Sequence, residues 1–410
     1  MDPFLSVYGH VTLDQILTVG RFPRDNTTED VLSKASSLGG TGANIAVAAA
    51  RLGCPTALCS LIGRDLPEQY RDLMADSGVI LDEMVEVDGY ETSTCIIAND
   101  PSLTQKVLFY QGPQGYGSTI GIDLESNAKR SSHVHFCTGD PEWYIGIMGD
   151  LEKPSKALDP AQESHRIWNA DSFGRALPLA DALFCNNYEA ESLRSYIGKD
   201  DILDADVPIV VCTEGAEGSR ARIGDDVLRI PAVAPDRLVD PTGCGDSYRA
   251  GYYAALYRGY DAPEALVVAS SVASFVLQET GALSGTPTWE QAIGRAEPWF
   301  GEIHRSCRLV LFIIVFHNHR AWFCMLSRAP RAPGRPPYPR SSGVAAWRSW
   351  TGRSSSGRTG CSESTMRTGT PTRSTWRRST PLSTDSDRWS TPSCWTAISP
   401  ISWTPEGSSS

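Results

Sequence analysis

Asp246 ends the string DPTGCGD, which stands directly before a helix predicted over residues 247–256. Small residues ahead of a helix let a ligand approach the backbone. The first helical N–H groups there have no intrahelical partner, so with the helix dipole they bind anions such as phosphate. A carboxylate beside them could take the proton of an attacking hydroxyl, so the string predicts phosphoryl transfer to an alcohol with Asp246 as base. The backbone groups around the phosphate would be those of Gly243, Cys244 and Gly245.

Asn44 ends a second Gly-rich string, GGTGAN, which opens a helix predicted over residues 45–52. Its glycines again allow close approach of a ligand, and Asn44 would project from the first helical turn. Each string also has an ordinary structural interpretation, because a tight turn followed by a helix-capping Asp or Asn contains the same residue types. Neither string alone separates the two interpretations.

Together, in this order and about 200 residues apart, the two strings resemble the signatures of the ribokinase or PfkB family of sugar and nucleoside kinases. The opening YGHVTLDQILTVGRFPRDNT looks most like archaeal members of that family. The resemblance implies an ATP-dependent kinase in which Asp246 is the catalytic base and Asp14, Gly40 and Asn44 bind substrate hydroxyls. Cys244 stands where relatives usually carry Ala, and we expect its thiol to make the site sensitive to oxidation or alkylation.

Two further patterns gain a role from the same resemblance. Asn186 and Glu189 follow an apolar run as Asn-x-x-Glu, the pattern that in the family organises Mg²⁺ and the phosphates, usually through water. A helix-capping Asn with an exposed Glu is the alternative. The resemblance also implies that four residues of two loops meet ATP: Thr213, Gly215, Gly218 and Thr242. A hairpin turn is the alternative interpretation of residues 213–218.

Apolar runs alternate with helical segments along the first 300 or so residues, and this alternation is typical of a parallel sheet covered by helices. We therefore predict a doubly wound, mostly parallel α/β domain of the ribokinase type over residues 1–305. Alternating stretches predict a small β lid from about residues 10–37 and 84–115. The resemblance implies that this lid covers the sugar and pairs with a second subunit.

His133 and His135 alternate in a strand predicted over residues 133–138. Alternating histidines can ligate a metal, but no carboxylate or third His stands at a useful spacing in the sequence. We therefore place both imidazoles on the polar face of the strand.

The chain divides into two parts of opposite charge near residue 305. Residues 1–305 carry a net charge of −21, whereas residues 306–410 carry +10, with 14 Arg, no Lys and seven of the 11 Trp. The acidic part argues against nucleic acid as a partner and indicates a salt-loving source, with an ordinary acidic enzyme as the alternative. The basic part has too few apolar residues to offset the entropy of ordering, so it is predicted to be disordered. Its composition indicates a wrong reading frame, and a nucleic-acid-binding tail is the alternative.

Cysteine usage and hydropathy indicate a cytoplasmic protein. The seven Cys of residues 1–305 include no Cys-x-x-Cys pair, and no apolar run is long enough to cross a bilayer. We expect a small-molecule substrate, no membrane or nucleic-acid partner, and a homodimer through the lid. An uncharged ribose-like sugar or nucleoside is the first expectation, because the lid offers only Lys106 to a phosphate; ribose 1-phosphate is the alternative. An alternative of another class is a catalytically silent ligand sensor or structural subunit.

Overall fold

The computed structural model describes residues 2–102 and 104–313, which form two sheets and ten α-helices. The strands are β1 (Leu5–Tyr8), β2 (Thr12–Val19), β3 (Val31–Gly39), β4 (Thr56–Ile62), β5 (Met84–Glu86), β6 (Thr94–Asn99), β7 (Gln105–Tyr110), β8 (His133–Phe136), β9 (Ser155–Leu158), β10 (Ala182–Asn186), β11 (Ile209–Thr213), β12 (Ser219–Ile223) and β13 (Asp226–Ile230). The helices are α1 (Thr41–Arg51), α2 (Glu68–Asp76), α3 (Gly117–Ile120), α4 (Ser126–Arg130), α5 (Pro141–Asp150), α6 (Ala170–Ala176), α7 (Asn187–Tyr196), α8 (Cys244–Tyr257), α9 (Ala262–Val276) and α10 (Trp289–Ile313).

The larger sheet has nine strands in the order β13-β12-β11-β10-β9-β8-β1-β4-β5. From β11 to β5 every neighbouring pair is parallel, and β12 and β13 extend the sheet as antiparallel strands. Adjacent residues of β1 belong to different hydrophobic clusters: the cluster of Val7 includes residues of α1, α2, α8, α9 and α10, whereas the cluster of Tyr8 includes residues of α4, α5, α6 and α7. The sheet is therefore covered on both faces, which confirms the doubly wound α/β fold.

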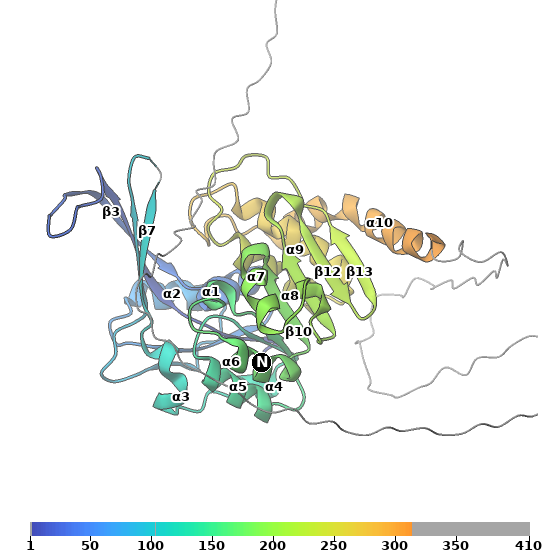
Figure 1. Cartoon of the computed structure of the whole chain (residues 1–410), viewed down its shortest axis with the longest axis horizontal. Coiled ribbons are helices and arrows are strands. Elements are labelled where there is room, and N and C mark those ends of the chain that lie inside the picture. The colour runs from blue at the N-terminus through green and yellow to red at the C-terminus, as the bar shows by residue number, and fades with distance from the viewer. Residues whose placement is uncertain (1, 103, 314–410) are drawn as a thin grey trace, which may run out of the picture. The chain divides into compact units, whose positions relative to one another are not determined.

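The smaller sheet has the order β3-β2-β6-β7 and forms the lid, which projects from the body beside α1 and α2 (Figure 1). Its strands β2 and β3 lie at the first range expected for the lid, residues 10–37, with β3 ending at Gly39. Its second half is shorter than predicted, because β5 pairs with β4 at the edge of the larger sheet instead of joining the lid. Met84 is buried there, and the short alternation in MVEV fits an edge strand as well as it fits a lid strand.

Two expectations near other elements also change. His135 does not lie on a polar face: it is fully buried in β8 and hydrogen-bonded to Asp159 and Tyr253. The last helix, α10, is described as far as Ile313 and so passes residue 305, the predicted domain boundary. The rest of the predicted disordered tail lies outside the described residues. No helix in the described part of the chain is long and apolar enough to span a bilayer.

Candidate active site

The two Gly-rich strings meet at the starts of two neighbouring helices. Asn44 lies in the first turn of α1 and Asp246 in the first turn of α8. The side-chain Nδ2 of Asn44 donates a hydrogen bond of 2.7 Å to Oδ2 of Asp246 across 202 residues of sequence. A helix-cap interpretation is not supported for either side chain, because neither helix start has a side-chain cap hydrogen bond. The structure thus brings together the predicted base and a predicted substrate ligand.

Several buried polar atoms on this side of the fold lack a hydrogen-bond partner among the described residues. They include Oδ1 of Asn44, Nδ1 of His10 and Oε1 of Gln111. His10 and Gln111 are adjacent, since Nε2 of His10 lies 3.2 Å from the carbonyl oxygen of Gln111. Buried polar atoms are normally paired, so these are places where a polar ligand would supply the missing partner. His10 and Gln111 have no motif in the sequence and were not predicted.

Asp246 is half-buried, and the surrounding protein atoms exclude much of the water from its carboxylate. Burial raises its pKa to about 6, and the repulsion from Asp159 and Asp14 acts in the same direction. The hydrogen bond from Asn44 and the charge of Arg249 oppose that rise. A pKa near the working pH suits a general base, because the carboxylate is ionised and still able to accept a proton.

Asp14 lies on β2 of the lid, close enough to Asp246 for the two carboxylates to repel. Its Oδ1 accepts a 2.6 Å hydrogen bond from the Thr12 hydroxyl. Burial raises the pKa of Asp14 as well. A Cβ on Gly39 would lie 2.0 Å from Oδ2 of Asp14, so this glycine leaves room for the carboxylate. Asp14 therefore lies near Asp246, and its contact with substrate stays a prediction.

The glycines before α1 make room for protein atoms. Gly40 has φ +96°, and a Cβ there would lie 2.3 Å from the carbonyl oxygen of His10. A Cβ on Gly42 would lie 2.6 Å from the carbonyl carbon of Gly9, at the end of β1. These close approaches seat α1 against the carboxyl end of β1. Direct contact of Gly40 with substrate stays a prediction.

The loop before α8 is held by its own contacts. Gly243 has φ +74° and packs so closely that a Cβ would lie 2.3 Å from Cβ of Ala282. The carboxylate of Asp240 accepts hydrogen bonds from the N–H groups of Thr242 (2.9 Å) and Gly281 (2.8 Å). The segment that precedes α8 is thereby tied to the segment that follows α9.

Cys244 differs from expectation in two ways. Its N–H donates to the carbonyl oxygen of Pro241 at 3.1 Å, so this one of the three predicted phosphate-binding backbone groups already has a partner. The N–H groups of Gly245 and Asp246 follow it in the first helical turn, where no helical carbonyl precedes them. Burial raises the pKa of the Cys244 thiol to about 11, so at neutral pH it is not a reactive thiolate. The expected sensitivity to alkylation is therefore weakened.

Asn186 and Glu189 form a capping box at the start of α7, beside the predicted phosphate site. Oδ1 of Asn186 accepts from the N–H of Glu189 at 2.9 Å, and Oε2 of Glu189 accepts from the N–H of Asn186 at 2.8 Å. The cap alternative is thus correct for Asn186, but Glu189 is half-buried instead of exposed. Burial and the charges of Asp159 and Asp246 raise the pKa of Glu189 to about 7.

The four residues predicted to meet ATP lie in two loops of different character. Thr213 ends β11 directly opposite Asn186 of β10. Thr213 pairs with Ser219 of the antiparallel β12, so residues 213–218 include the turn of a hairpin. Gly218 has φ +87°, and a Cβ there would lie 2.1 Å from the carbonyl oxygen of Ile230. Gly215 faces open space, and Thr242 is exposed. Contact of any of the four with a nucleotide stays a prediction.

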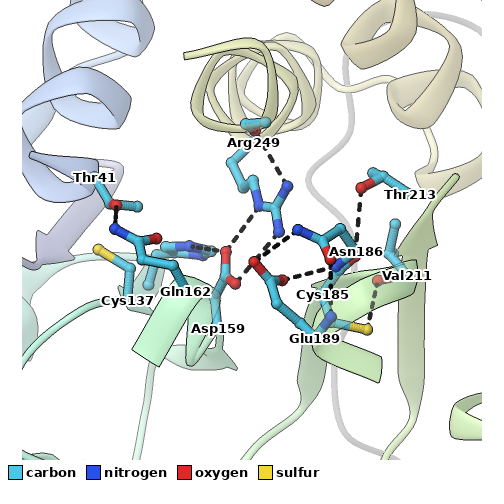
Figure 2. A network of polar contacts seen from close by, with 12 residues as sticks. Thr41, Cys137, Asp159, Gln162, Cys185, Asn186, Glu189, Val211, Thr213 and Arg249 are labelled. Atoms are coloured by element: carbon cyan, nitrogen blue, oxygen red, sulfur yellow. Dashed lines mark hydrogen bonds and ion pairs between the residues drawn. The ribbon is translucent and has the colours of Figure 1, made fainter. Parts of the chain in front are cut away.

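A buried polar network beneath α8 was not predicted. Arg249 donates from Nε to Oδ2 of Asp159 at 2.8 Å, and Nε2 of His135 lies 3.2 Å from the same oxygen. Figure 2 shows the guanidinium pointing from α8 toward Asp159 and the Asn186–Glu189 pair. Burial would raise the pKa of Asp159, but Arg249 and His135 outweigh it and lower that pKa to about 2. The only sequence signal was an Asp at the carboxyl end of a strand.

Comparison with known proteins shows which family the chain belongs to. Residues 2–289 match the model of the pfkB family carbohydrate kinases. The chain belongs to this family. A nucleoside kinase from Methanothermobacter thermautotrophicus is 33% identical over 305 residues, which cover 73% of this chain and 97% of that protein. An ATP-dependent ribose-1-phosphate kinase from Halopiger xanaduensis is 29% identical over 287 residues, covering 67% of this chain and 92% of that protein.

Among solved structures, the nucleoside kinase of Methanocaldococcus jannaschii, described as an archaeal member of the ribokinase family, has a TM-score of 0.67 and 27% identity. The match covers 72% of this chain and 99% of that one. As a pfkB kinase, the present chain is an ATP-dependent phosphotransferase whose acceptor is an alcohol group of a sugar or nucleoside. The predicted family and enzyme class are confirmed.

The donor atoms of this pfkB kinase are compatible with Mg²⁺ held through water. Within the described residues no group of three or more His, Cys, Asp or Glu side chains could hold a metal by itself. Mg²⁺ prefers hard oxygen ligands and usually keeps several waters and phosphate oxygens. Burial is the main cause of the raised pKa of Glu189, and the negative charges of Asp159 and Asp246 add to it; a divalent cation nearby would favour the ionised carboxylate. Asn186 and Glu189 therefore fit an outer role around a hydrated cation.

Proposed function

We propose that the chain is a Mg²⁺-dependent nucleoside kinase that transfers the γ-phosphoryl group of ATP to a hydroxymethyl group of the ribose. The hydrogen bond between Asn44 and Asp246 is the observation that carries the proposal. It leaves Oδ1 of Asn44 free to accept a hydrogen bond from a substrate hydroxyl within reach of the carboxylate. The 33% identity to a nucleoside kinase over nearly its whole length supports the choice of a nucleoside.

The reaction follows from these positions. Asp246 takes the proton of the substrate hydroxyl as the oxygen attacks the γ-phosphorus; the new O–P bond forms and the bond to the β-phosphate oxygen breaks. The N–H groups of Gly245 and Asp246 would stabilise charge on the transferred group. Mg²⁺, organised by Asn186 and Glu189 through water, would neutralise charge on the phosphates. Asp14 and Asn44 hold the acceptor, and the lid excludes water that would otherwise compete with it.

A panel of nucleosides and pentoses assayed with ATP and Mg²⁺ tests this function, with Asp246→Asn as the decisive variant. We expect phosphorylation of at least one nucleoside and a loss of turnover of about 100-fold or more in Asp246→Asn. Asp261→Asn is the matched control, because Asp261 also stands at a helix start, where it caps α9, and Asn caps equally well. Unchanged turnover in Asp246→Asn would remove this residue as the base. Failure of the whole panel would leave the silent-sensor alternative.

A phosphorylated substrate is the second candidate, because the structure places a cation beside the lid. Arg166 lies 5.1 Å from the ring centre of Phe109 on β7 and forms an ion pair of 2.8 Å with Glu163. The sequence had suggested only Lys106, whose Nζ lies over the ring of Phe22. Ribose 1-phosphate belongs in the panel for this reason. A preference for it over nucleosides that Arg166→Gln abolishes would favour this candidate.

A further inference from the structure

Arg249 lies in the second turn of α8 and bonds to two segments of the chain near Asp246. Its side chain is almost completely buried, with 5% of the residue exposed. Nε and Nη2 donate to the two carboxylate oxygens of Asp159 at 2.8 and 3.3 Å, and Nη1 donates to the carbonyl oxygen of Gly245 at 3.2 Å. A single guanidinium therefore joins the loop after β9 to the first turn of α8. The five N–H donors of Arg lie in a rigid fork, which lets one side chain bond to both places at once.

The contact with Gly245 bears on the predicted phosphate site through the geometry of one peptide group. The C=O of Gly245 and the N–H of Asp246 belong to the same planar trans peptide and point in opposite directions. The helix aims this carbonyl oxygen toward the backbone N–H of Arg249, four residues on, and the guanidinium adds a second donor that keeps the N–H of Asp246 directed out of the helix start. That N–H lies in the first turn of α8, where it can donate to the transferred phosphoryl group.

Asp159 is itself fixed, so Arg249 is anchored to the sheet. Burial lowers the pKa of His135, so its imidazole is neutral. Because a carboxylate only accepts, Nε2 of His135 donates to Asp159, and Nδ1 accepts from the hydroxyl of Tyr253 at 2.9 Å. Tyr253 lies one turn after Arg249 on the same face of α8. The hydrogen bonds run from Arg249 through Asp159 and His135 to Tyr253, so two residues of α8, one turn apart, are tied to β8 and to the residue after β9.

The space at Gly245 agrees with this contact. A Cβ there would lie 3.2 Å from Nη1 of Arg249, tighter than most side-chain contacts. The second glycine of the DPTGCGD string thus leaves room for the guanidinium as well as for a ligand. The charge of Arg249 also acts on both Asp246 and Glu189.

We propose that Arg249 is a positioning residue of the phosphoryl-transfer site. It holds the Gly245–Asp246 peptide in the orientation that presents an N–H to the phosphate of ATP. The inference concerns the binding of ATP. Only the kinetic measurement with a nucleoside acceptor rests on the proposed function. Neither DPTGCGD nor any other string of the sequence analysis includes this residue.

The test compares Arg249→Met and Arg249→Lys with the matched control Arg258→Met. Arg258 directly follows the last residue of α8, donates to the carbonyl oxygens of Ala254 and Leu52, and lies over the ring of Trp289, at the opposite end of the helix from Gly245. Affinity for a non-hydrolysable ATP analogue with Mg²⁺ is measured by calorimetry without acceptor. The kcat and both KM values are then measured with the best nucleoside, and Tm by thermal unfolding.

In both Arg249 variants we expect analogue affinity and kcat to fall about tenfold each, with the KM for nucleoside unchanged, as when one preorganised donor loses its orientation. Arg258→Met should lower Tm and leave all affinities unchanged. Arg249→Lys keeps a positive charge beside Asp159, so it decides the matter if Arg249→Met does not fold. Wild-type analogue affinity in Arg249→Lys would overturn the positioning role. Since this binding needs no acceptor, the inference is still tested if no nucleoside is phosphorylated.

Discussion

Three acidic side chains at this site, Asp159, Asp246 and Glu189, have different pKa values because their surroundings differ. Asp159 is fully buried but paired with Arg249 and His135, and its pKa is lowered to about 2. Asp246 and Glu189 lack such a partner, and burial raises their pKa values to about 6 and about 7. Asp159 is therefore a permanent anion that anchors Arg249. Asp246 is the carboxylate suited to take up a proton.

The titration of Asp246 predicts the pH dependence of activity. A general base works only when ionised, so kcat/KM should fall as the pH decreases through about 6, in line with the raised pKa of this group. The measurement is a profile of kcat/KM against pH with saturating ATP. A profile that stays flat well below that pH would contradict the assignment.

Thermal stability gives the control that attributes the profile to Asp246. A carboxyl group whose pKa is raised by folding stabilises the folded protein below its unfolded pKa, and this contribution is lost as pH rises through the folded pKa. Asp246→Asn mimics the protonated form. It should therefore have a higher Tm than the wild type above about pH 6, and the difference should vanish below the ordinary pKa of Asp.

At the scale of elements, two glycines at the start of α8 are needed for different structural reasons. Gly243 supplies a left-handed turn against Ala282, whereas Gly245 leaves space beside Arg249. The far end of the same helix also turns through a left-handed glycine, Gly259 at φ +84°, but nothing lies within 4 Å of the Cβ it would carry. Substitutions at these two glycines therefore distinguish the cost of a left-handed backbone from the cost of close packing.

Gly243→Ala should destabilise the protein by about 2–4 kcal/mol, from the left-handed backbone and the collision with Ala282 together. It should also lower kcat, because the phosphate loop must shift. Gly259→Ala, which meets only the backbone cost, should lose about 1 kcal/mol and keep its activity. Urea unfolding and steady-state kinetics measure both effects. Equal losses in the two variants would show that close packing at Gly243 contributes nothing.

At the scale of the whole molecule, the lid leaves apolar side chains exposed. Ile16 on β2, Ile97 on β6 and Val107 on β7 form one row across three paired strands, on the same face as Asp14. Ile16 is 37% and Val107 52% exposed. Within residues 2–102 and 104–313, no further strand pairs with the outer edges of β3 and β7. Exposed apolar rows and open edges are places where another chain binds.

We propose that a second copy of the chain covers this row, so that the enzyme is a dimer through its lids. Val107→Asp should convert the dimer to a monomer at micromolar concentration, as measured by light scattering after size-exclusion chromatography. Leu108→Asp is the matched control, because adjacent strand residues point to opposite faces and Leu108 is exposed as well. A monomeric wild type, or dissociation by Leu108→Asp alone, would contradict the proposal.

The sequence by itself determined the parts of this protein that depend on local order. Alternation of apolar and helical segments specified a doubly wound fold, because a parallel sheet buried on both faces imposes that pattern on nearby residues. The strings ending at Asn44 and Asp246 carried the phosphoryl-transfer chemistry, since an open helix start is a property of one short segment. Where the local pattern fitted two elements equally, as at β5, the prediction was wrong.

Only the tertiary structure decided which of these parts act on one another. The bond between Asn44 and Asp246, the pKa of Asp246, and the pairing of Arg249 with Asp159 all join residues that are far apart in the chain. Arg249 reads in the sequence as one more polar residue of a helix. Its burial and partners arise only when α8 packs over the carboxyl ends of β8 and β9. Electrostatic interaction depends on distance and solvent exclusion in space, and neither quantity is written in the order of the residues.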